Sequence, residues 1–182
     1  MKEFRIDIRK LRLPNYGGLS LTIALIVATM LLCFTLIRNP YRALHRDIFV
    51  TADKIRSHYR DRPGYWKLST ATAKQDNLIG AELLDHDGYD VRVGMGREGE
   101  SGMPNDAAFD IVLSNLSKSA CINLTELPID ESQKLGLQKI TIVTDNGITE
   151  FAWGGEYPLP IAKYDVRDIC QPGDNIVMWT FQ

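Results

Sequence analysis

The stretch Leu137–Trp153, LQKITIVTDNGITEFAW, gives the strongest local structural signal in this chain. Apolar and polar residues alternate on both sides of Asp145-Asn146-Gly147, as they do in strands with one buried face. Asn-Gly favours the positive φ angles of a tight turn, so the stretch predicts a β-hairpin that turns at Asn146 and Gly147. An antiparallel sheet is therefore expected in this half of the chain.

Other alternating segments predict further strands of that sheet. GYDVRVG (residues 88–94) and AAFDIVLS (residues 107–114) flank a glycine-rich segment over residues 94–106, which is expected to be a loop. NIVMWTF (residues 175–181) reads as a last strand, and short helices are expected within residues 77–84 and 115–127. The fold class is therefore α+β.

An amphipathic helix is expected after residue 40. Its apolar residues recur at spacings of three and four, which places them on one helical face: Leu44, Ile48, Ala52, Ile55 and Tyr59. Charged residues fill most of the remaining positions, and Pro63-Gly64 is a stop signal. This helix is expected to pack on the antiparallel sheet through its apolar face.

An uncharged, largely apolar segment of 19 residues, Leu19–Ile37, precedes the amphipathic helix. A helix of that length covers about 28 Å, close to the thickness of the hydrocarbon layer of a membrane. We therefore expect one long N-terminal helix over residues 19–62, membrane-spanning over residues 19–37 and kinked near Pro40, where proline removes a hydrogen bond. A cleaved secretory signal peptide and a plain uncleaved anchor are the alternatives for this segment.

Three regions follow from this pattern: a leader over residues 1–18, the long helix over residues 19–62, and a globular domain over residues 63–182. The leader has five basic and two acidic residues, which favours an N-terminus held in the cytoplasm. The net charge of −2 and the sequence pI of about 5.9 give no support for a nucleic-acid partner.

Three cysteines are present, at positions 33, 121 and 170. Cys33 lies inside the apolar segment, and bonding it to either of the others would pull the globular domain into the membrane. The remaining pair, Cys121–Cys170, is expected to form a disulfide that closes the C-terminal region, a loop of about 50 residues worth about 4 kcal/mol on the chain-entropy estimate. Two buried free thiols are the alternative.

Motifs that would indicate catalysis or a cofactor are weak. Residues 94–99, GMGREG, match a dinucleotide-binding pattern but lack the helix that must follow it. The acidic segment Asp85–Asp90 has the wrong spacing for an EF-type calcium loop, although calcium binding there is left open. His45, His58 and His86 share no metal-ligand spacing. We therefore expect no enzyme, no cofactor and no metal site.

These features together resemble the type IV pilins and pseudopilins of bacteria, particularly the type IVb group. The resemblance rests on the basic leader ending at Gly18, the uncharged segment directly after it, Pro40 about 22 residues further on, and two cysteines in SKSACINL and DICQPGDNIVMWTF. It implies cleavage by a prepilin peptidase between Gly18 and Leu19, with methylation of the new N-terminus at Leu19.

One position departs from the family pattern. Most members carry Glu as the fifth residue after cleavage, where it pairs with the free amine of a neighbouring subunit, and this chain has Ile23. Members without that Glu tend to be minor pilins or pseudopilins at filament tips. The resemblance therefore implies a minor pilin or pilin-like subunit.

The function expected from the resemblance is structural. The chain would be made as a single-pass protein of the bacterial inner membrane with a periplasmic C-terminal domain, then assembled with other pilin subunits into an extracellular type IVb pilus or a related secretion or conjugation filament. An inner-membrane assembly platform would be a further partner, and cell adhesion a further role. The alternative hypotheses are an anchored periplasmic secretion component that does not polymerise, and an anchored periplasmic enzyme or binding domain.

Overall fold

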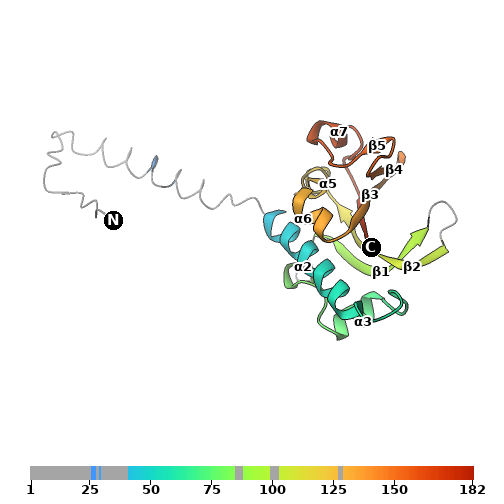
Figure 1. The fold of residues 1–182 in the computed structure, drawn as a ribbon. Coiled ribbons are helices and arrows are strands. Elements are labelled where there is room, and N and C mark those ends of the chain that lie inside the picture. The colour runs from blue at the N-terminus through green and yellow to red at the C-terminus, as the bar shows by residue number, and fades with distance from the viewer. Residues whose placement is uncertain (1–25, 28, 30–40, 85–87, 99–102, 127–128) are drawn as a thin grey trace, which may run out of the picture. The chain divides into compact units, whose positions relative to one another are not determined.

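The computed structural model describes residues 26–27, 29, 41–84, 88–98, 103–126 and 129–182. The chain divides into two units, residues 1–39 and residues 40–182. The three described residues of the first unit are helical. The second unit (Figure 1) contains, in chain order, α2 (Tyr41–Tyr59), α3 (Thr70–Gln75), α4 (Ala81–Leu84), β1 (Asp90–Glu98), β2 (Met103–Leu116), α5 (Lys118–Thr125), α6 (Ile129–Lys134), β3 (Leu137–Thr144), β4 (Gly147–Ala152), β5 (Tyr157–Pro158), α7 (Lys163–Arg167) and β6 (Asn175–Phe181).

Six strands form one sheet in the order β1-β2-β6-β3-β4-β5. The first five strands of this row pair antiparallel, whereas β5 pairs parallel to β4. The sheet is therefore mixed, and the expectation of a purely antiparallel sheet is wrong. The cause is the connection after β4, where the chain turns at Gly154 with a φ of +71° and brings Tyr157 beside Phe151 in the same direction.

The expected hairpin is confirmed as strands β3 and β4, but its turn lies one residue earlier than expected. Thr144 pairs with Gly147, so Asp145 and Asn146 form the turn, and of the Asn-Gly pair only Gly147 has a positive φ, +132°. The hydroxyl oxygen of Thr144 accepts a hydrogen bond from the backbone N–H of Asn146 at 3.3 Å. Such local side-chain bonds favour one turn over its neighbours, which explains the shift.

Most of the glycine-rich segment that was expected to be a loop is strand. β1 continues to Glu98 and β2 begins at Met103, so residues 99–102 alone separate them, and those residues lie outside the described ones. The pairing shifts register between Met95 and Gly96. A Cβ at Gly96 would meet that of Ala108 at 2.9 Å, so glycine is needed here for the close approach of the two strands.

Helix α2 confirms the predicted apolar stripe. All five residues are at most 5% exposed and belong to the same core as the inward-facing side chains of the strands, Phe109, Ile111 and Trp179 among them. Burying a large apolar side chain stabilises a fold by about 1.5–3 kcal/mol relative to leaving it in water. The stripe therefore holds α2 on the sheet of its own chain.

The prediction of one long helix over residues 19–62 is wrong. Among the residues that the structure describes, the longest helix is α2, and none combines the length and apolar character needed to cross a membrane. This finding also contradicts the expected single-pass inner-membrane localisation. Two features of the sequence explain why α2 is neither longer nor membrane-spanning. Pro40 stands directly before α2 and disfavours helical geometry at the residue that precedes it. Six of the 19 residues of α2 are charged, which is unfavourable inside a membrane.

Candidate functional site

The predicted disulfide between Cys121 and Cys170 is confirmed. The two Sγ atoms lie 1.98 Å apart, the Cα atoms lie 6.0 Å apart, and neither residue is exposed. Cys121 belongs to α5, and Cys170 follows the end of α7. The bond therefore fastens the C-terminal segment to the helix that covers the middle of the sheet.

Next to the disulfide, Asn175 organises the chain before the last strand. Its amide nitrogen donates to the carbonyl oxygens of Leu116 at 2.8 Å, Gln171 at 2.9 Å and Gly173 at 2.8 Å, and its amide oxygen accepts from the N–H of Gln171 at 2.8 Å. Asn175 is 0% exposed. Sequence reasoning missed this residue, although an asparagine opening an apolar strand after Pro-Gly-Asp was a signal for it.

The other predicted site residues lie outside the described ones: Gly18, Leu19, Ile23 and Pro40. The cleavage site, the methylation site, the position that lacks Glu and the helix kink therefore stay predictions. Within the described residues there is no group of three or more His, Cys, Asp or Glu side chains placed to hold a metal ion.

Both histidines on α2 have polar partners, His45 at a half-buried position and His58 at an exposed one. The ring Nε2 of His45 is 2.9 Å from the carbonyl oxygen of Asn123 in α5, and that of His58 is 3.5 Å from Asp76. Desolvation lowers the pKa of His45, although the bond to Asn123 and the nearby Glu126 oppose that shift. His45 therefore links two helices in its neutral form.

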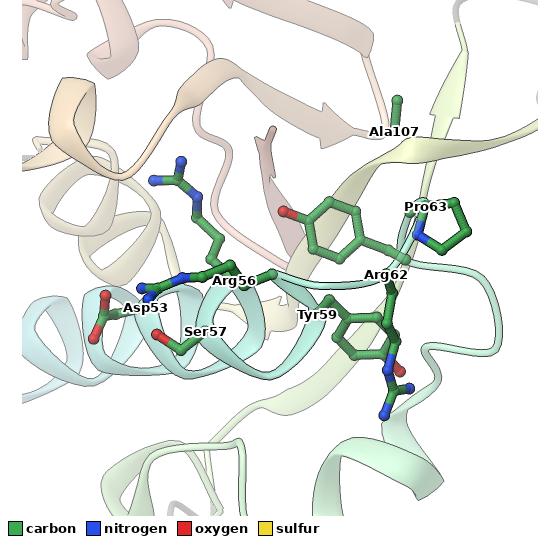
Figure 2. A pocket seen from close by; sticks show the side chains of 10 residues that line it. Asp53, Arg56, Ser57, Tyr59, Arg62, Pro63 and Ala107 are labelled. Atoms are coloured by element: carbon green, nitrogen blue, oxygen red, sulfur yellow. The ribbon is translucent and has the colours of Figure 1, made fainter.

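A pocket of about 460 Å³ opens at the C-terminal end of α2 (Figure 2). Its walls come from the last turns of α2, from the loop that follows, and from Ala107 of β2 on the opposite side. Three guanidinium groups and one carboxylate line it together with two tyrosines: Arg56, Arg60, Arg62, Asp53, Tyr59 and Tyr65. We call this feature the arginine pocket.

Two of the arginines have fixed positions. Arg56 donates from Nη1 to the carbonyl oxygen of Lys134 at 3.0 Å. The guanidinium carbon of Arg62 lies 4.7 Å from the centre of the Tyr59 ring, and the two side chains are adjacent in Figure 2. A cation over an aromatic face is attracted by the electron density of the ring, so Tyr59 holds Arg62 in place.

Tyr65 connects the arginine pocket to the core. Its ring centre is 5.6 Å from that of Tyr59 and 4.7 Å from that of Phe109, which is fully buried. Burial raises the pKa of Tyr65, and the neighbouring Arg56 partly offsets that rise. The hydroxyl therefore keeps its proton near neutral pH and adds a donor to the wall of the pocket.

The chain matches no protein-family model, and a comparison with curated proteins finds no match. The similarity to type IV pilins therefore stays a prediction from the sequence. The arginine pocket was not predicted, although three arginines within seven residues, interleaved with Tyr59, are a signal for it.

Proposed function

We propose that this chain is a structural subunit of a type IVb pilus or a related secretion or conjugation filament, and that it acts by assembly with other subunits. Prepilin peptidase would prepare it by cutting between Gly18 and Leu19. The absence of Glu at Ile23 favours a minor subunit, because the carboxylate that docks onto a neighbouring subunit in most pilins is missing.

The contrast between two neighbouring segments carries this proposal. Helix α2 buries its apolar stripe against the sheet of its own chain, so that face is already satisfied. Residues 19–37 contain no charged residue and are mostly apolar, so their exposure to water is unfavourable. Packing these segments against one another in several copies is an economical way to bury them and would stabilise a filament.

The globular unit supports the same role. An amphipathic helix packed on a sheet, with a disulfide near the C-terminus, gives a rigid body that a filament can display. A disulfide that closes a long loop limits unfolding of the chain, which suits a protein that works in an oxidising environment.

Cleavage is tested by the intact mass of the protein purified from its native host. The expected mass lacks the first 18 residues and includes one methyl group on Leu19. Gly18→Leu should keep the leader, because a bulky side chain would occupy the junction, whereas Gly17→Leu is the matched control and should still be cut. Retention of residues 1–18 in the wild type would contradict the proposal.

Assembly is tested in a strain that lacks this protein. Filaments counted by electron microscopy should fall in number or length, and the wild-type gene supplied in trans should restore them. Normal filament numbers together with normal secretion and conjugation would rule out the filament role.

A further inference from the structure

We propose that the arginine pocket is a binding site for a carboxylate group. Carboxylate binding would be a property separate from assembly through residues 19–37. The pocket lies on the globular unit, and none of its residues belongs to that segment.

The charges that line the pocket are unbalanced. Arg56, Arg60 and Arg62 contribute three positive charges, and Asp53 contributes one negative charge. The C-terminal end of α2 adds about half a negative charge from its carbonyl groups. The excess is therefore about one and a half positive charges, which favours binding of an anion.

Arg60 is the residue free to bind. It is exposed, and among the residues that the structure describes it makes no hydrogen bond or ion pair. Guanidinium groups bind carboxylates through two parallel N–H···O bonds, a geometry that the ammonium group of lysine does not offer. Arg60 therefore has its full set of donors available for a ligand.

The other two arginines of the pocket are already held by contacts within the chain. Arg56 is tied to Lys134 and Arg62 is stacked on Tyr59, and each keeps further N–H donors beyond these contacts. Donors that are already ordered lose less conformational entropy when a ligand binds. The hydroxyl of Tyr65, which Arg56 hydrogen-bonds, lines the same pocket and keeps its proton to donate.

Two sources could supply the carboxylate: a free small carboxylate, or an exposed Asp or Glu side chain of a second copy of this chain. The second source rests on the proposed function, because it makes the pocket a contact between subunits. Both sources share the chemistry of the site, and they differ in whether binding changes the state of association.

The test is calorimetric titration of the full-length protein with succinate, at an ionic strength kept constant with sodium chloride. We expect saturable binding that weakens about tenfold or more in Arg60→Gln, because a charge-assisted hydrogen bond is lost. Arg60→Lys should be intermediate. Arg42→Gln, an exposed arginine at the other end of the same helix, is the matched control and should bind as the wild type does.

The outcomes separate cleanly. Absence of succinate binding, equal affinity in Arg60→Gln, or tighter binding of phosphate than of succinate would overturn the assignment. Sedimentation velocity then identifies the source: self-association that succinate and Arg60→Gln both abolish supports a carboxylate of a second copy. Succinate binding with no change of association supports a free carboxylate. The filament counts in the deletion strain test the proposed function separately.

Discussion

The side-chain amide of Asn175 donates a hydrogen bond to the carbonyl oxygen of Leu116 at 2.8 Å, across 59 residues of sequence. Leu116 ends β2 just before α5, and Asn175 begins β6. The bond therefore fixes the point at which the last strand enters the sheet between β2 and β3. This point is close to the disulfide, because α5, which contains Cys121, begins just after Leu116.

Replacing this amide should be costly. Asn175→Ala removes the hydrogen bonds of a fully buried side chain, among them the bond to the carbonyl oxygen of Leu116, which is buried as well. An unsatisfied buried polar group costs about 1–3 kcal/mol, so we expect a loss of about that size in urea denaturation. Gln75→Ala, an exposed polar residue near the end of α3, is the control and should change stability by less than about 0.5 kcal/mol.

The disulfide should stabilise the unit through its long loop. The bonded cysteines are separated by 49 residues, for which the chain-entropy estimate gives about 4 kcal/mol. We expect the double substitution Cys121→Ala/Cys170→Ala to lower the free energy of unfolding by about that amount under non-reducing conditions. Adding a reductant should destabilise the wild type and leave the double variant unchanged; equal responses of the two proteins would contradict a structural role for the bond.

The elements that sequence reasoning predicted well are those specified by local patterns. The spacing from Leu44 to Tyr59 fixes a helical face, and alternation around residues 145–147 fixes a hairpin, because both depend on neighbouring residues alone. The position of β6 between β2 and β3 depends on pairing between distant segments. The parallel strand β5 was not predicted either, because its two residues are too few to show a periodic pattern.

The sequence did not predict the arginine pocket, because this pocket also depends on contacts between distant segments. Arg56 and Arg60 read as the solvated face of a helix, and Arg62 reads as part of a loop. Their relation to Ala107 and Tyr65 arises only when β2 folds against the end of α2. The disulfide was predictable because three cysteines leave few pairings, whereas a pocket assembled from a helix, a loop and a strand has no comparable counting rule.

Acid should destabilise the contact between α2 and α5. Burial lowers the pKa of His45 in the folded protein below its ordinary value of 6.5, so the unfolded chain binds more protons between those two values. Stability from the neutral ring is therefore complete above pH 6.5 and falls as the pH drops through the folded pKa.

His45→Gln is the variant that tests this dependence. Glutamine keeps a donor for the carbonyl oxygen of Asn123 but does not titrate, so the free energy of unfolding should fall less between pH 7 and about pH 5 than in the wild type. Denaturation curves across that range measure the difference. Parallel pH profiles of the two proteins would show that His45 is not the source of the acid sensitivity.

Gly80 occupies a narrow space between α2 and α4, and enlarging it should be destabilising. Its N–H donates to the hydroxyl oxygen of Thr51 at 2.9 Å, and the N–H of Glu82 donates to Oδ2 of Asp47 at 2.8 Å. Asp47 and Thr51 are one helical turn apart and face the same way, so together they dock α4. A Cβ at Gly80 would lie 2.6–2.8 Å from three atoms of the Asp47 side chain.

Gly80→Ala should therefore displace the carboxylate of Asp47 and weaken its bond to Glu82. Overpacking of this kind costs about 1–3 kcal/mol, which urea denaturation measures directly. Gly94→Ala is the matched control, because a Cβ there would meet no atom within 4 Å and the residue lies in a strand, where alanine costs no more than glycine. If both variants unfold at the same urea concentration, the close approach of Gly80 to Asp47 does not limit stability, and α4 is held by its apolar contacts instead.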